Sequence, residues 1–570
     1  MTRSFAVHHA CLFVALAGMA PLAIAQVAVT RATPPEAAVD AVFERYDGKD
    51  TPGCSVAVID AGKVLLKKSY GMADPSLGVP MTSSITHWIP YSEGRVFVAL
   101  AVAMLARDGK ITLDDPIRTH VPQVPGYASA VTVRQLLHHT SGLADYLVLD
   151  AAGDSMWTRV SEDEFFRVLA LWNKLGSTPG QQQTYSNTDY ALLEMLVERV
   201  SGGSLHDYLH SKLLGPLGMA STRIGADQAV VHPGHALFYT TDDEGFRRMF
   251  PYRTSPVGGI SVTTNLDDLI RWESALRDPA SGVASLMTEL EAGAPSPSSK
   301  AETDDEGYSF GVYRRTHQGL PLVEYRGVSG YHYLVQVPGT ALSVATLCNA
   351  YPGMDRLGPD VARLYAAPAT GSAATARTVG PPVDVPASEL RRYVGEYRNP
   401  NARRFVDVTI ANGALVIAPR GAKALTGVVA HGNGKFTTVI DDSWTLLMEF
   451  EEGENGDMTL SQWNATSNES SGDDFQRWTS WKPDAGALKQ YEGTYVGDDI
   501  EAILHVRSDG GRVLVASKGT AETALNPWDK ADHFSGPDIY TTRFERDASG
   551  RVTALVLDAK RVKGMRYTKT

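Results

Sequence analysis

Eleven consecutive apolar residues, Val96–Ala106, follow the short polar stretch Ser92–Arg95. The polar residues Arg107–Gly109 end the run, and a glycine just after the last apolar residue is a common C-terminal signal of a helix. The run is too short to span a bilayer, which takes about 20 apolar residues. The pattern therefore predicts a buried core helix with Ser92 at its N-terminus.

Strand patterns lie on both sides of a helical middle. Two apolar runs, Cys54–Ile59 and Val64–Leu66, flank the turn residues Asp60–Lys63, which predicts a β-hairpin. Strand patterns return at 322–325, 331–337 and 341–347. Terminal strands around helices indicate an α+β domain whose sheet joins both ends of this segment.

A short motif repeats in the last third of the chain. Leu-x-x-Tyr-x-Gly-x-Tyr begins at Leu390 and again at Leu488, and short alternating strand patterns follow each copy. Turn signals, Asn412–Gly413 and Asp509–Gly511, divide the strands. We expect two small antiparallel β-barrels or sandwiches.

The first residues are typical of a secretory signal. Arg3 precedes the apolar stretch Leu12–Ile24, and Ala23–Ala25 forms a small-x-small cleavage site before Gln26. An uncleaved membrane anchor is the alternative. We favour cleavage, and so expect a periplasmic or secreted protein without stable membrane insertion.

These boundaries give five parts. We assign 1–25 to the signal peptide, 26–365 to the α+β domain, 366–386 to a linker rich in Ala, Thr, Gly and Pro, 387–482 to the first β domain and 483–570 to the second.

The net charge and the cysteines limit the partners and cofactors that we expect. The net charge of −12, without a basic stripe, argues against a nucleic-acid partner. Cys54 and Cys348 lie in apolar strand patterns, and the sequence leaves open whether they are buried free thiols or one disulfide. We find no Cys/His spacing typical of zinc and expect no metal or organic cofactor.

Several local patterns follow the core helix in a fixed order. They are Leu113–Pro116, Leu136–Leu143 (Leu-Leu-His-His-Thr-Ser-Gly-Leu), Tyr185–Asn187, Pro216–Met219, Gly258–Ile260, Asp268–Trp272 and Tyr325–Gly330. Taken together, they make residues 35–360 resemble the serine β-lactamase and penicillin-binding-protein superfamily. The likeness is to the branch with class C β-lactamases, esterases, D-alanyl-D-alanine carboxypeptidases and D-aminopeptidases, and the two β domains look like those of D-aminopeptidase-type members.

The resemblance makes Ser92 the nucleophile that attacks a carbonyl and forms an acyl-enzyme. The family's Ser-x-x-Lys lysine corresponds to Arg95, which stays charged and cannot act as a base, because its pKa lies above about 12. Arg95 is left with electrostatic support of a neighbouring phenol or substrate, or with structural hydrogen bonds alone.

Two further motifs of the family have counterparts. Tyr185 corresponds to the tyrosine of Tyr-x-Asn and would carry the proton between Ser92 and the leaving group, while Asn187 would donate to a substrate carbonyl. In the third motif, Lys-Thr-Gly or His-x-Gly, Tyr325 replaces the cation and Gly327 is kept. The N–H groups of Val328 and Ser92 would form the oxyanion hole.

The pair His138–His139 suggests a metal or a triad, but in the family this stretch is structural. We therefore expect a serine hydrolase that acts by acyl transfer on an ester, a D-amino-acid amide or a peptide. The alternative is a catalytically degenerate protein that binds a ligand or cell-wall peptide without turnover, because two of the three motifs have changed. The acyl group, the leaving group and the oligomeric state stay open.

Overall fold

The computed structural model describes residues 29–89, 94–152, 161–225, 234–242, 245–248, 261–292, 308–317, 319–325, 332–351, 356–368, 379–399, 405–419, 424–441, 444–453, 456–464, 470–517, 522–536, 539–559 and 561–570. The predictions for the signal peptide, Ser92, Gly327 and Val328 fall outside these residues. No helix in the described part is long and apolar enough to cross a membrane.

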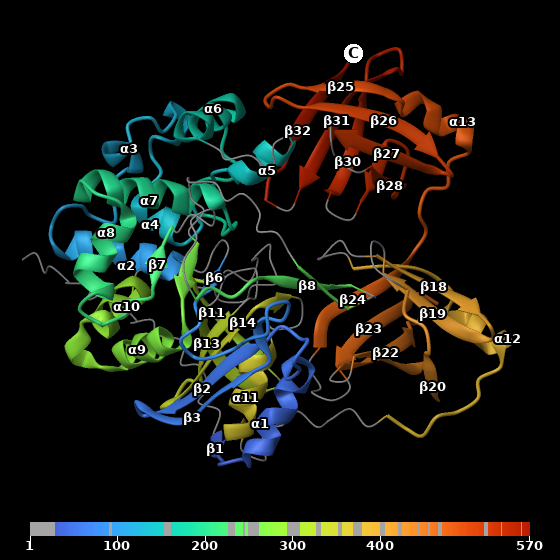
Figure 1. Ribbon diagram of the computed structural model, residues 1–570. Helices are drawn as coiled ribbons and strands as arrows, with labels where there is room; N and C mark the ends of the chain where they lie inside the picture. Colours follow the sequence, from blue (N-terminus) through green and yellow to red (C-terminus); the bar gives the residue numbers. More distant parts are fainter. Residues whose placement is uncertain are drawn as a thin grey trace, which may run out of the picture.

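An antiparallel sheet of six strands forms the centre of the first domain (Figure 1). In spatial order its strands are β11 (Val312–His317), β12 (Leu320–Tyr325), β13 (His332–Gln336), β14 (Leu342–Cys348), β2 (Cys54–Asp60) and β3 (Lys63–Tyr70). The predicted hairpin is β2–β3, and β14 pairs with β2 along its whole length. The sheet thus joins both ends of the segment, as the strand patterns predicted.

Side chains of the central strands alternate between two buried clusters, because successive residues of a strand point to opposite faces. Val56 and Val58 belong to one cluster, while Ala57 and Ile59 belong to the other. Helices α1 (Glu36–Phe43) and α11 (Leu357–Tyr365) complete the first cluster. The helical middle of the chain completes the second. Burial on both faces explains why β2 and β14 are mostly apolar on both sides instead of alternating between apolar and polar residues.

The helical middle is built on α2 (Arg95–Arg107), which confirms the predicted core helix. Nearly every residue of α2 is buried, as its uninterrupted apolar sequence implies. Helix α7 (Asn187–Ser201) packs on α2, and α4 (Val133–Leu137) packs on α7. Helices α9 (Leu266–Arg277) and α10 (Val283–Ala292) close the other side. Two of the predicted site residues, Arg95 and Asn187, are the first residues of α2 and α7.

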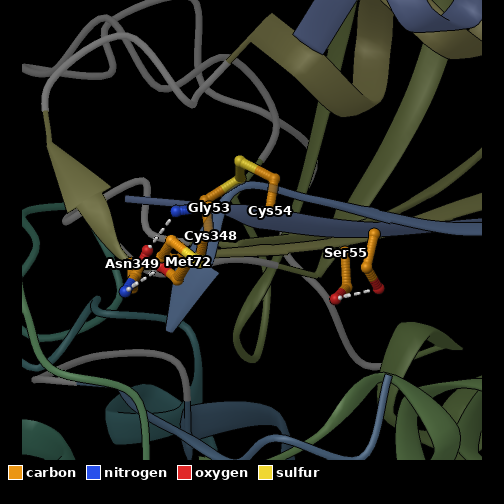
Figure 2. Close-up of a disulfide and its surroundings, with 7 residues drawn as sticks. Gly53, Cys54, Ser55, Met72, Cys348 and Asn349 are labelled. Atoms are coloured by element: carbon orange, nitrogen blue, oxygen red, sulfur yellow. Dashed lines mark hydrogen bonds between the residues drawn. A yellow bond between two sulfur atoms is a disulfide. The ribbon is translucent and has the colours of Figure 1, made fainter. Parts of the chain in front are cut away.

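A disulfide joins Cys54 to Cys348, which are directly opposite each other on β2 and β14 (Figure 2). The residues beside both cysteines are also linked, because the Gly53 N–H donates to Asn349 Oδ1 at 2.7 Å. Asn349 Nδ2 donates in turn to three backbone carbonyls, including that of Met72. A Cβ at Gly53 would lie 2.1 Å from a carbonyl oxygen, so only glycine fits there. Of the two states left open by the sequence, the structure has the disulfide.

Both C-terminal regions are eight-stranded and antiparallel. The first has the order β19-β18-β17-β24-β23-β22-β21-β20, and an isolated bridge from Ile417 to Leu425 links β19 to the segment before β20. The second closes fully into a barrel, β25 to β32. Its strands span residues 493–569, and those of the first sheet span 395–478. The α+β domain followed by two barrel-like β domains is the predicted fold class.

The repeated motif has the same structural role in each β domain. The Tyr397 hydroxyl donates to the carbonyl of Tyr393 at 2.8 Å, and the Tyr495 hydroxyl donates to that of Tyr491 at 2.7 Å. Both bonds are buried and connect a short helical turn to the first strand of the domain. Gly493 has a φ of +149°, and a Cβ there would lie 2.8 Å from a lysine side chain. The motif therefore marks the start of each β domain.

The second β domain packs against the helical middle through α5 (Tyr146–Ala152) and α6 (Glu162–Trp172) (Figure 1). Leu149 and Trp172 belong to the same buried cluster as the core of the barrel. Two ion pairs flank this contact. Arg167 bonds Glu501 at 2.6 Å, and Lys174 bonds Asp499 at 2.9 Å. This interface brings the barrel beside the predicted site.

Candidate active site

Arg95 is the first residue of α2, yet its side chain is only 2% exposed. Its Nη2 donates to Oδ1 of Asn187, the first residue of α7, at 2.7 Å. A buried guanidinium is unfavourable unless polar groups face it. The Asn187 amide meets this requirement at Nη2, and the rings of Tyr185 and Tyr190 face the guanidinium carbon at 4.1 and 4.9 Å. A buried cation therefore lies where helices α2 and α7 begin.

Tyr185 lies against this cation. The Arg95 guanidinium carbon is 4.1 Å from the centroid of the Tyr185 ring, and that of Arg561 is 4.3 Å away. Contacts of this kind are attractive and become stronger when they are shielded from water. Tyr185 itself is 6% exposed. The phenol predicted to carry the proton thus has two guanidinium groups beside its ring.

A buried carboxylate connects these groups. Asp145 Oδ2 accepts from Asn187 Nδ2 at 2.7 Å and from Arg561 Nη1 at 3.1 Å, and the Asp145 side chain is 0% exposed. A continuous chain of polar contacts therefore runs from Arg95 through Asn187 and Asp145 to Arg561. One N–H of Asn187 donates to Asp145, and its amide has a second N–H, the group that the sequence predicts as a donor to a substrate carbonyl.

His139 packs against Tyr185 and Tyr308, and the three rings form an aromatic wall. Its ring is 4.7 Å from that of Tyr185 and stacks on Tyr308 at 4.9 Å. Its Nδ1 lies 2.7 Å from Oδ2 of Asp189, and Ser141 Oγ donates to the other oxygen of Asp189 at 2.5 Å. Because Ser141 bonds the carboxyl group and not the imidazole, the arrangement is unlike a nucleophilic triad. It positions Tyr185 from behind.

Burial determines the protonation states of His139, Asp189 and Tyr308. It lowers the pKa of His139 well below its usual value, and the nearby Arg95 charge lowers it further. Burial raises the pKa of Asp189 well above its usual range, even though Ser141 donates to it. It also raises the pKa of Tyr308 to about 12. His139 and Asp189 therefore form a neutral pair.

Three of the predicted site residues come together: Arg95, Tyr185 and Asn187. Tyr325 ends β12, and its hydroxyl donates to Gln336 Oε1 at 3.2 Å. Burial raises the pKa of Tyr325, so its phenol stays protonated. In the described part of the chain, no group of three or more His, Cys, Asp or Glu side chains could hold a metal.

Sequence reasoning missed Asp145 and Arg561. Asp145 lies two residues after the Leu136–Leu143 pattern, so the pattern could have been extended to include it. Arg561 is 416 positions from Asp145 and lies between β31 (Val552–Ala559) and β32 (Met565–Lys569). No local pattern distinguishes it from other surface arginines.

The profile of the family described as Beta-lactamase matches residues 39–367, which is more than half of the chain. The chain belongs to the Beta-lactamase family. Its similarity to Protein flp of Staphylococcus aureus is 30% identity over 175 residues, covering 30% of this chain and 34% of that protein. Penicillin-binding protein 4* of Bacillus subtilis is 26% identical over 304 residues, covering 51% of this chain and 66% of that protein.

The matched stretches span about a third of the staphylococcal protein and less than two thirds of the Bacillus protein. Among solved structures, the octameric penicillin-binding protein homologue from Pyrococcus abyssi aligns over 78% of this chain and 99% of its own, with a TM-score of 0.50 and 21% identity. That likeness concerns the fold. Membership of the Beta-lactamase family supports hydrolase chemistry of the serine type.

Proposed function

We propose that the chain is a secreted serine hydrolase. Its substrate, an ester, a D-amino-acid amide or a peptide, would transfer its acyl group to Ser92, and water would then release that group. One observation carries the proposal. Arg95, Tyr185 and Asn187, which come from motifs 90 or more positions apart, meet in one buried contact. The phenol and the amide that acyl transfer at Ser92 would use both contact the same buried cation, which supports the proposal.

The roles follow from the chemistry of each group. Tyr185 takes the Ser92 proton as the oxygen bonds to the substrate carbonyl carbon, and it returns that proton to the leaving group. Water then attacks the acyl-enzyme by the same route in reverse. Arg95 holds its positive charge throughout and stabilises negative charge on the phenol oxygen. The N–H groups of Ser92 and Val328 would bind the oxyanion.

The proposed compartment is the periplasm or the exterior. Its support is the predicted signal sequence together with the Cys54–Cys348 bond, because disulfides persist in oxidising compartments. Fractionation with an antibody against the chain would test this. Recovery of the intact precursor in the cytoplasm would contradict it.

The first experiment is intact-protein mass spectrometry after exposure to a fluorophosphonate probe and, separately, to p-nitrophenyl acetate and a penicillin. We expect one adduct per chain with the fluorophosphonate, and none in Ser92→Ala. Comparing the three reagents shows whether esters or β-lactams acylate the site. A folded wild type without any adduct would overturn the hydrolase proposal.

A binding protein without turnover is the second candidate, and Arg95 is the observation that favours it. A guanidinium cannot take the serine proton, and here it is buried and bonded to Asn187. On this alternative, Ser92→Ala would leave the affinity for a captured cell-wall peptide unchanged. The hydrolase proposal instead expects the wild type to release a hydrolysed product that Ser92→Ala does not release.

A further inference from the structure

Arg561, a residue of the second β domain, reaches the candidate active site. Arg561 lies between β31 and β32, and its Nη1 donates to Oδ2 of Asp145 at 3.1 Å. Its guanidinium carbon is also 4.3 Å from the Tyr185 ring centroid. Its charge is among those that lower the pKa of His139, which agrees with a position beside the aromatic wall.

The contact between Arg561 and Asp145 takes a carboxylate out of water, which costs free energy, so its presence indicates a role for the pair. Asp145 is 0% exposed, whereas the Arg561 side chain keeps 23% of its exposure. A fully buried carboxylate needs a positive partner or several hydrogen bonds. Asn187 Nδ2 and the Leu147 N–H supply neutral donors to Asp145, and Arg561 supplies the positive charge. Without Arg561, the nearest cation on this chain of contacts is Arg95, on the far side of Asn187.

The surrounding interface keeps Arg561 in place. Ala144, the neighbour of Asp145, belongs to the buried cluster that contains the barrel core. Two ion pairs between exposed side chains, Arg167–Glu501 and Lys174–Asp499, lie at the rim of this interface and contribute little to its stability. The barrel is therefore docked at the point from which Arg561 enters.

We propose that Arg561 is a positioning residue of the hydrolase site: it fixes Asp145 and, through Asp145, the orientations of Asn187 and Arg95. This inference rests on the proposed function, because it assigns a role in the same reaction. It makes the second β domain a part of the active site, which is complete only when the barrel is docked.

The test compares full-length variants on p-nitrophenyl acetate. This ester carries no carboxylate, so a loss of rate cannot come from a missing ion pair with the substrate. We expect Arg561→Met to lower kcat/KM about 100-fold, the size of effect that a displacement of about 1 Å in a catalytic group produces. Arg561→Lys should recover to within about tenfold of the wild type, because one ammonium can replace the single Nη1 bond.

A double-mutant cycle shows whether Arg561 acts through Asp145. If it does, Asp145→Asn combined with Arg561→Met should be no slower than the slower single variant. Arg167→Met is the matched control, since it removes an arginine from the same interface without touching the site. Its kcat/KM should stay within about twofold of the wild type. Circular dichroism and thermal melting confirm that each variant is folded.

The outcomes separate the two proposals. An active wild type whose Arg561→Met variant is equally fast overturns the role of Arg561 alone. Additive losses in the cycle, or an equal loss in Arg167→Met, show a docking contact without a role in positioning. A folded wild type that reacts with neither the ester nor the fluorophosphonate overturns the proposed function, and the site role of Arg561 with it.

Discussion

Arg95 and Asn187 are 92 positions apart in the chain, and a buried hydrogen bond of 2.7 Å joins them where helices α2 and α7 begin. Each is the first residue of its helix. The N-terminus of a helix carries a partial positive charge, which an added cation opposes. The bond to Asn187 and the contact with Tyr185 compensate for this. Arg95 is thus held by the residues that it is proposed to support.

The first prediction concerns the charge of Arg95. Arg95→Lys should retain or raise kcat/KM, because lysine keeps the positive charge and can also release a proton. Arg95→Met should lower kcat/KM by at least about 100-fold, since no positive charge then faces Tyr185. Steady-state kinetics on p-nitrophenyl acetate will measure both. Equal rates in all three proteins would exclude Arg95 from the mechanism.

The second prediction concerns the disulfide. Cys54 and Cys348 are 294 positions apart, and a cross-link over so long a loop restricts the unfolded chain strongly. Replacing both cysteines with alanine should lower the free energy of unfolding by about 4 kcal/mol. Urea unfolding of the oxidised and reduced wild type provides the comparison. If reduction leaves the urea midpoint where it was, the bond does not contribute to stability.

A third prediction follows from the repeated motif. Tyr397→Phe and Tyr495→Phe each remove a buried donor and leave a carbonyl unsatisfied, which should cost about 1–3 kcal/mol. Each change should destabilise its own β domain, as detected by hydrogen exchange of strands 395–478 or 493–569. Each variant serves as the control for the other. Loss of protection in both domains from one change would contradict a local role.

The fourth prediction is a loss of stability in mild acid. Burial lowers the pKa of His87 to about 3 and that of His138 to about 4, whereas the unfolded chain takes up these protons near pH 6.5. Below that pH the unfolded state binds more protons than the native state, so stability falls as the pH falls. Between pH 6.5 and 5, each histidine should cost about 2 kcal/mol.

Urea unfolding across this pH range measures the effect. His138→Gln is the variant to compare, because glutamine retains a polar partner for Ser309 Oγ, which lies 3.0 Å from His138 Nδ1. Its stability should depend less steeply on pH by one proton. An identical slope in the variant would show that His138 does not titrate between the two states.

Local patterns predicted what local forces determine. The helix α2 and the hairpin β2–β3 could be predicted directly, because the uninterrupted apolar run ended by a glycine indicates the helix and the turn residues between two apolar runs indicate the hairpin. The closing of the sheet by β14 followed from the layout of strands around helices. Arg95, Tyr185 and Asn187 could be grouped only through the order of several motifs, since no spacing rule connects α2 to α7.

What remained hidden depends on contacts between distant segments. The sequence could not choose between free thiols and a disulfide, because the bond requires the register that places Cys54 opposite Cys348. Asp145 and Arg561 meet only because one barrel docks on α5 and α6. The pair of Asp145 and Arg561 therefore results from tertiary packing, which no periodic pattern in the sequence indicates.

Because β2 pairs with β14, the central sheet cannot be completed until long after β2 has been synthesised. At about 5–20 residues per second, the ribosome adds the 294 residues between Cys54 and Cys348 in about 15–60 s. During that interval β2 has its hairpin partner β3, but the opposite edge of β2 has no strand to pair with. An apolar strand edge in this state is prone to wrong association. We therefore expect the nascent chain to be most prone to wrong association in the interval before β14 has been made.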